Sequence, residues 1–288
     1  MGAPPHEDGS SPHDPARGLE LAGVGVRFGG LTALEDVSLR VPPGRIVGVI
    51  GPNGAGKTTV FNVVCGFVVP HAGTITLDGR RLRPRPHRLT RLGIARTLQG
   101  VGLFAGLTLA ENVMAGATGS ARAGFLSSLL ATPWAAREER RLRTGAVEIL
   151  ERLGIGGHAD ALPATLPYAI QKKAGLARAL AARPRLLLLD EPAGGLGAEE
   201  IDELAALIRG LPAAAGTAVL LVEHHMDLVM SVCDEIVVLD FGRVVATGTP
   251  DQVRGDPAVA AAYLGTEAIT PDGTPGAVAP EETGTVTR

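Results

Sequence analysis

The sequence has little cysteine, no large excess of charge of either sign and no long uninterrupted hydrophobic run. Its 288 residues include two cysteines, Cys65 and Cys233, far apart in the chain. This excludes a disulfide-stapled secreted domain and a zinc ribbon. The formal net charge is −3, from 27 basic and 30 acidic residues. No global positive field would draw the chain to polyanions, so we expect no nucleic-acid partner.

Membrane spans and secretion signals are also missing. The longest uncharged run, residues 58–77, is interrupted by asparagine, glycine, proline and histidine, which makes it a poor membrane span. Residues 1–18 are rich in proline, glycine, histidine and acidic residues and do not resemble a signal peptide. Hydrophobic residues make up 45% of the chain, enough for a sizeable core. We expect a soluble cytoplasmic protein.

The two ends of the chain differ in composition from its middle. Residues 1–18 have few apolar side chains, and residues 266–288 are rich in threonine, glycine, proline and acidic residues. Neither segment can bury enough surface to offset a backbone ordering cost of roughly 1–2 kcal/mol per residue. We therefore predict two disordered tails and one domain over residues 19–265.

Strand-like runs within that domain are of two kinds. Runs 19–28 and 33–41 flank a glycine-containing turn and predict an antiparallel pair. Other runs are short and almost wholly apolar, which is typical of strands buried on both faces. These runs are residues 45–51, 185–191 and 217–223. A further strand is expected at 74–80, and a late hairpin within 235–248.

A helical pattern interrupts these strands. Residues 134–153 place apolar side chains on one stripe and charges on the remaining face. Glu139 and Arg143 have the spacing of an ion pair within a helix. The surrounding segment, about 101–165, has no strand signals. The pattern predicts a helical subdomain inserted into an α/β core.

A glycine-rich motif follows the strand-like run at 45–51. Residues 51–59 read GPNGAGKTT and fit G-x-x-x-x-G-K-[ST] between a strand and a helix. In such a loop, successive backbone N–H groups converge on phosphate oxygens, and the following helix adds its unpaired N-terminal donors. The lysine contacts the β- and γ-phosphates, and the first threonine can ligate Mg²⁺. The predicted nucleotide-binding residues are Gly51, Pro52, Asn53, Gly54, Ala55, Gly56, Lys57, Thr58 and Thr59.

Two acids and a histidine end other strand-like runs. Asp190 and Glu191 follow four leucines, at the carboxyl end where open α/β sheets place ligand chemistry. Asp190 is suited to hold Mg²⁺, and Glu191 to polarise the attacking water as a general base. Without the phosphate loop, the pair would instead indicate a capped helix start. His224 lies where a γ-phosphate sensor is needed, and the adjacent His225 has no metal-site spacing around it.

The order of these motifs resembles the ATP-binding-cassette (ABC) ATPases, and more closely the ATP-binding subunit of branched-chain amino-acid importers. The motifs are the phosphate loop, ARTLQ, LPYAIQKKAGLARAL, LLLLDEP and EHH, together with FLSSLLATPW and GTPDQVRGDPAVAAAYLG. The resemblance covers about residues 19–266. It implies an α/β P-loop fold of the ABC type: a mixed central sheet, an antiparallel β subdomain and a helical subdomain that extends to about residue 183.

The resemblance also assigns ligands and roles. ATP and Mg²⁺ are the expected nucleotide and cofactor. Phe28 would stack on adenine, the alternative being an ordinary core phenylalanine. Gln99 would reach Mg²⁺ and the attacking water, and His224 the γ-phosphate. The implied catalytic residues are Glu191, His224 and Gln99, and the implied metal ligands are Thr58, Gln99 and Asp190.

The partners follow from the same resemblance. Two cassettes close head to tail on ATP and drive transmembrane permease subunits from the cytoplasmic face of the membrane, while an external solute-binding protein takes part indirectly. Urea or short amides are the alternative solutes. A nucleotide-switched regulatory protein of low turnover is the alternative function, although such proteins usually carry two cassettes or a coiled-coil insertion. A P-loop small-molecule kinase would have no place for LPYAIQKKAGLARAL.

The chain departs from the family where it would meet a partner. The signature reads LSGGQ or LPYGQ in the family, whereas Ala169 here replaces the glycine and Ile170 the glutamine. A Cβ would hinder close approach to the γ-phosphate or exclude the required backbone geometry, and Gln171 would substitute only after a register shift. Gly197 and His225 also replace acidic or amide residues usual at their positions. We expect an asymmetric heterodimer with a second cassette, a homodimer being the alternative.

Overall fold

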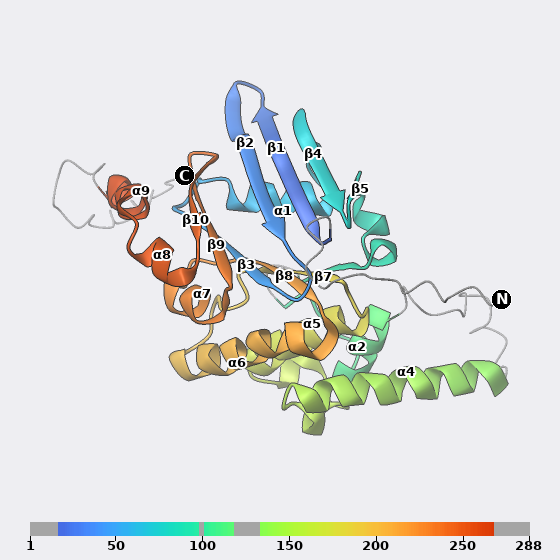
Figure 1. Cartoon of the computed structure of the whole chain (residues 1–288). Helices are drawn as coiled ribbons and strands as arrows, with labels where there is room; N and C mark the ends of the chain where they lie inside the picture. The colour runs from blue at the N-terminus through green and yellow to red at the C-terminus, as the bar shows by residue number, and fades with distance from the viewer. Residues whose placement is uncertain (1–16, 98–100, 118–132, 268–288) are drawn as a thin grey trace, which may run out of the picture.

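The computed structural model describes residues 17–97, 101–117 and 133–267, and two sheets form its framework (Figure 1). The first is antiparallel, in the order β2-β1-β4-β5. Its strands are β1 (Leu19–Phe28), β2 (Leu31–Val41), β4 (Ala72–Leu77) and β5 (Arg80–Arg81). The second has the order β10-β9-β3-β8-β7-β6. Its strands are β3 (Ile46–Ile50), β6 (Ile94–Arg96), β7 (Leu186–Asp190), β8 (Ala218–Val222), β9 (Glu235–Asp240) and β10 (Arg243–Gly248).

Five strands of the second sheet run parallel, and β10 returns antiparallel to β9. Every residue of β3, β7 and β8 is buried, which explains why these strands are apolar throughout rather than alternating. The carboxyl ends of the parallel strands lie at one edge of the sheet. The loops that follow β3, β7 and β8 therefore meet there.

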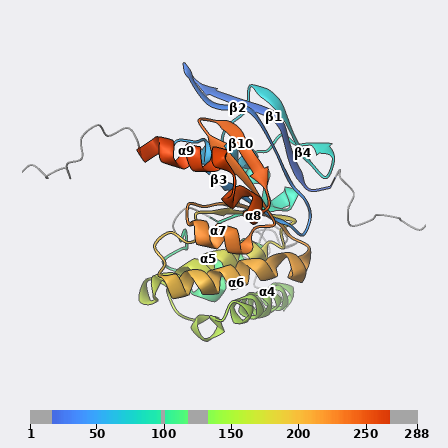
Figure 2. The same cartoon turned by 60° about the vertical axis from the view of Figure 1, so that its left-hand side comes forward.

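Helices cover both faces of this sheet. On one face, α1 (Lys57–Cys65) lies between the two sheets; on the other lies a helical layer (Figures 1 and 2). The remaining helices are α2 (Leu109–Ala117), α4 (Pro133–Arg152), α5 (Tyr168–Ala181), α6 (Ala198–Ala215), α7 (Met226–Val232), α8 (Pro250–Arg254) and α9 (Pro257–Glu267). Short 3₁₀ turns occupy Pro86–Arg88, Thr90–Leu92, Gly156–His158 and Pro163–Thr165.

The core has two parts, one on each face. Leu186 and Leu188 of β7 pack with Phe61 of α1 and with the antiparallel sheet. Leu187 and Leu189 point the other way and pack with the helical layer. The alternation follows from the two-residue period of a strand. Because of this alternation, the end of β7 that carries Asp190 lies between the helical layer on one side and α1 with the antiparallel sheet on the other.

Most of the predicted elements are confirmed. The β1–β2 pair, the strands β3, β4, β7 and β8, and the β9–β10 hairpin all form. Strand β6 gave no signal because it has three residues. Glu139 and Arg143 both lie in α4, as their spacing requires, and Arg143 pairs with Asp160 in the loop beyond that helix. The pair between Glu139 and Arg143 stays a prediction.

The predicted division of the chain stays a prediction. The proposed helical subdomain contains α2 and α4 and continues into α5. Nearly all of both predicted tails lies outside the described residues, although α9 continues two residues past the predicted domain end at 265. Within the described ranges, no helix has both the length and the apolar character that a membrane span requires.

Candidate functional site

The phosphate loop connects β3 to α1, as predicted. Gly56 caps α1 in a left-handed conformation with φ of 101°, and no side chain caps the helix. The first turn of α1 also carries no acidic residue. Its unclaimed N–H groups and the positive end of its dipole therefore favour an anion.

Gly51 is required by the close approach of its backbone to β9. Its φ is +149°, and a Cβ built on it would lie 2.1 Å from the carbonyl oxygen of Leu239. Gly54, with φ of +82°, has open space around its Cβ position. Both glycines therefore have a backbone conformation that favours glycine, and Gly51 in addition makes a close contact that a Cβ would block.

A Gly51→Ala substitution is expected to destabilise the chain by about 3 kcal/mol or more, because backbone atoms of β3 and β9 must separate. Gly54→Ala, the matched control, adds only left-handed strain of about 1 kcal/mol. Urea unfolding of both variants measures the difference. Equal losses would show that the contact with Leu239 has no role.

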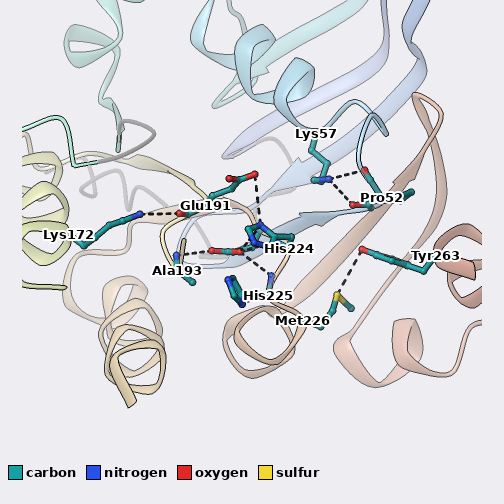
Figure 3. A network of polar contacts seen from close by, with 11 residues as sticks. Pro52, Lys57, Lys172, Glu191, Ala193, His224, His225, Met226 and Tyr263 are labelled. Atoms are coloured by element: carbon teal, nitrogen blue, oxygen red, sulfur yellow. Dashed lines mark hydrogen bonds and ion pairs between the residues drawn. The ribbon is translucent and has the colours of Figure 1, made fainter. Parts of the chain in front are cut away.

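Lys57 points back into the loop (Figure 3). Its Nζ donates to the carbonyl oxygens of Gly51, at 2.7 Å, and Pro52, at 2.9 Å. Burial lowers the pKa of Lys57, an effect that the negative charge of Glu191 opposes. The ammonium group is therefore held inside the loop at a cost, which phosphate oxygens would relieve by replacing neutral carbonyls with anions.

Asp190, at the end of β7, forms a buried ion pair with Arg96 at the end of β6. Arg96 Nη2 lies 2.9 Å from Asp190 Oδ2, with side-chain exposures of 18% and 3%. The Arg96 guanidinium also lies 4.9 Å from the centre of the Phe61 ring and 5.5 Å from that of Phe67. Burial raises the pKa of Asp190, and the hydrogen bond and charge of Arg96 oppose that rise.

An Arg96→Met substitution is expected to destabilise the chain by about 3 kcal/mol, because Asp190 stays buried without a cation. Arg243→Met is the matched control: its pair with Glu35 is 65% and 50% exposed, and its loss should cost about 0.5 kcal/mol.

The loss should depend on pH. Without Arg96 the pKa of Asp190 lies further above its ordinary value of 3.8. The part of the deficit that comes from the unpaired charge is therefore absent at pH values below 3.8, where Asp190 is protonated in the folded and the unfolded protein. It grows as the pH rises through the raised pKa of the folded protein. Urea unfolding should show a smaller deficit at pH 5 than at pH 8, and the reverse order would contradict this assignment.

Glu191 and His224 face each other across the same edge (Figure 3). His224 Nδ1 lies 3.9 Å from Glu191 Oε1, and both side chains are partly exposed. Glu191 has a φ of +45°, an uncommon conformation for a non-glycine residue that is often found at active sites. Two hydrogen bonds flank it: Glu191 N–H donates to Val222, and Lys172 Nζ donates to the Glu191 carbonyl at 3.4 Å.

The remaining predicted site residues divide into two groups. Thr58 and Thr59 lie in the first turn of α1, beside Lys57. Phe28, at the end of β1, is 51% exposed, so the alternative of an ordinary core phenylalanine is wrong. Gln99 lies outside the described residues, and its proposed contacts stay a prediction.

The altered signature segment begins α5. Ala169 lies in the first turn of that helix with an ordinary negative φ, so the expectation that its Cβ excludes the backbone geometry is wrong for this chain. Ile170 is half-buried against the helical layer of the core. Gln171 donates through Nε2 to the Leu166 carbonyl at 2.9 Å, so its amide is already engaged. The steric effect of Ala169 on a partner's nucleotide stays a prediction.

Two residues of the site were not predicted. Arg96 lies within the ARTLQ segment, but nothing local in the sequence indicates that it reaches Asp190, 94 positions away. Glu223, in the strand-ending EHH, is wholly buried and accepts three backbone N–H bonds. A charged residue at the end of an apolar strand was the available signal for it.

These features define a class of protein. The site of a P-loop nucleoside triphosphatase combines a helix without a side-chain cap behind a glycine loop, an inward-facing lysine, and an Asp-Glu pair at the end of a neighbouring strand. The family described as "ABC transporter" matches residues 34–194, and that described as "Branched-chain amino acid ATP-binding cassette transporter" matches residues 243–269. The chain belongs to the ABC transporter family and is an ATP-binding cassette ATPase.

Relatives and solved structures agree. The chain is 44% identical over 248 residues to the high-affinity branched-chain amino acid transport ATP-binding protein BraF of Pseudomonas aeruginosa, covering 86% of this chain and 97% of BraF. It is 42% identical to the high-affinity branched-chain amino acid transport ATP-binding protein LivG of Escherichia coli K12, again covering 86% of this chain and 97% of LivG. An ABC-transporter cassette solved in its ADP conformation is 29% identical, with a TM-score of 0.74 over 86% of this chain and 98% of that one. The predicted family, fold and ATPase activity are confirmed.

Proposed function

We propose that this chain is the ATP-hydrolysing subunit of an importer for branched-chain amino acids and works at the cytoplasmic face of the membrane. The observation that carries the proposal is the 44% identity to BraF over nearly all of that protein's length. The separate match of residues 243–269 to the branched-chain amino acid family supports it outside the nucleotide site. Permease subunits would receive the motion, with a solute-binding protein beyond them.

The site residues then have the following roles. The loop 51–59 holds the phosphates, with Lys57 exchanging its carbonyl partners for phosphate oxygens. Glu191 orients the attacking water and accepts its proton, and His224 contacts the γ-phosphate. Phe28 offers an exposed ring to the base.

The donor set fits Mg²⁺. The Thr58 hydroxyl and the Asp190 carboxylate are hard oxygen ligands, and the ion pair with Arg96 engages Oδ2 of Asp190. Thr58, Asp190 and Gln99 would hold the ion. When bound, Mg²⁺ neutralises charge on the β- and γ-phosphate oxygens.

The partner is proposed to be a second, different cassette. The residues that face this chain's own nucleotide are all present, whereas the signature it offers carries Ala169 and Ile170. The half-burial of Ile170 in the core turns a position that is polar in the family into a packing position. A loss of about 3 kcal/mol of transition-state stabilisation would slow the opposite site about a hundredfold.

The experiment uses the complete complex of both cassettes and the permease. Glu191→Gln in this chain is expected to remove more than nine-tenths of ATP turnover and of leucine uptake into proteoliposomes. The equivalent change in the partner should spare most of both. If most turnover survives Glu191→Gln, the proposed asymmetry is wrong. If the unmodified complex hydrolyses ATP but takes up no leucine, the proposed solute is wrong.

A further inference from the structure

Glu223 is a carboxylate buried at the centre of the site's polar network. It is 0% exposed and directly follows β8. A buried carboxylate is costly unless its oxygens accept hydrogen bonds, and a merely structural position could be filled by an apolar residue like those that precede it in β8. The hydrogen-bond donors of the Glu223 carboxylate therefore indicate why an acidic residue occupies this position.

Three backbone N–H groups from two loops converge on this carboxylate. Oε1 accepts from Ala193 N–H at 2.8 Å. Oε2 accepts from His224 N–H at 2.8 Å and from His225 N–H at 3.1 Å. Oε1 therefore accepts from the loop after β7, and Oε2 accepts from the loop after β8.

The loop after β7 connects Glu191 to α6 through a turn, residues 192–197, that contacts Tyr168 of the signature segment. Ala193 is wholly buried, and Gly194 N–H donates to the Glu191 carbonyl at 3.2 Å. Gly195, with φ of +80°, packs so closely under Tyr168 that an added Cβ would lie 3.0 Å from Cε1 of the ring. A displacement of Tyr168, at the start of α5, would therefore also displace the 192–197 turn.

The loop after β8 carries His224. Its Nδ1 lies 3.7 Å from Glu223 Oε2 and 3.9 Å from Glu191 Oε1. The backbone position of His224 is set by the bond from its N–H to Glu223. The same carboxylate thus holds the histidine and the turn that touches the signature helix.

We propose that Glu223 is a positioning residue for ATP hydrolysis, which ties the backbone of the 192–197 turn to that of His224 so that the position of the turn sets the distance between His224 and Glu191. The proposal rests on the assignment of Glu191 and His224 under the proposed function. A metal site at Glu223, His224 and His225, whose ligand atoms lie within 4.8 Å of one another, is the weaker interpretation because the carboxylate already accepts three hydrogen bonds.

Glu223→Gln is the most selective test, because it keeps shape and removes acceptor capacity. An amide has one oxygen, and its NH₂ group cannot accept a hydrogen bond. With the oxygen kept on the two histidine N–H groups, the NH₂ group faces Ala193 N–H and that link is lost. The turn is then released from His224 while the phosphate loop is untouched.

The expected result in the complete complex is a fall in kcat of at least tenfold, with ATP affinity changed less than threefold. A stability control is Val41→Ala, a buried position in β2 at the far end of the β1–β2 pair from Phe28. It should lower the unfolding temperature without changing kcat. If Glu223→Gln leaves kcat within twofold of the Val41→Ala variant, Glu223 is only a structural residue.

Two further measurements separate the possible failures. His224→Ala in the same assay tests the proposed function: if turnover survives it, the catalytic assignment fails, whereas a loss with His224→Ala but not with Glu223→Gln overturns only the positioning role. Amide hydrogen exchange on the unmodified chain needs no variant. Ala193, His224 and His225 should show one common protection factor, because one opening exposes all three amides, and independent protection factors would overturn the link.

Discussion

Replacing Glu191 by glutamine is expected to lower ATP turnover by at least a hundredfold while ATP binding is retained. The amide keeps the size of the side chain but cannot accept a proton from water, and general-base catalysis contributes about 10²–10⁴ in rate. The phosphate loop and Lys57 are unchanged, so the affinity for ATP should stay within about threefold. Phosphate release and nucleotide titration of the same preparation measure the two quantities.

The control for this variant is an acid of the same type outside the site. Glu203→Gln removes an exposed carboxylate of α6 that pairs with Lys173, and it should leave turnover unchanged. A Glu191→Gln protein that still hydrolyses ATP at more than a tenth of the unmodified rate would require another base.

Removing the side chain of Lys57 is expected to abolish tight nucleotide binding. The ammonium lies inside the phosphate loop, and each charge-assisted hydrogen bond to a phosphate is worth about 1.5–3 kcal/mol. Lys57→Ala should therefore weaken ATP binding roughly 100-fold or more, as measured by calorimetric titration.

Lys173→Ala provides the matched control. The chain has three lysines, Lys57, Lys172 and Lys173, and Lys173 pairs with Glu203 on the helical layer. Its loss should leave ATP affinity unchanged. If the Lys57→Ala and Lys173→Ala proteins bind ATP with equal affinity, the phosphate loop does not bind the nucleotide.

The parts of the site that the sequence predicts are those whose chemistry is local. The loop 51–59 is a contiguous motif, and Asp190, Glu191 and His224 each end an apolar run, so pattern alone locates them. The parallel strands were predictable for the same reason. Strand β6 was too short to show a pattern.

The residues that the sequence did not predict act at a distance. Arg96 meets Asp190 across 94 positions, and Glu223 meets Ala193 across 30. Neither contact can be found before the order of β6, β7 and β8 in the sheet is known. The expectation that a Cβ on Ala169 excludes the required backbone geometry was wrong for a related reason. Ala169 lies within the first turn of α5, where a helical φ suits any side chain.

This chain is proposed to supply an intact nucleotide site but an altered signature to its partner. Sedimentation of the Glu191→Gln protein with MgATP, alone and mixed with the candidate second cassette, tests it most directly, because blocked hydrolysis traps a closed dimer wherever one can form. We expect a dimer only in the mixture, and only when MgATP is present. A stable dimer of the Glu191→Gln protein alone would contradict the claim, since Ala169 and Ile170 would then still serve as a signature.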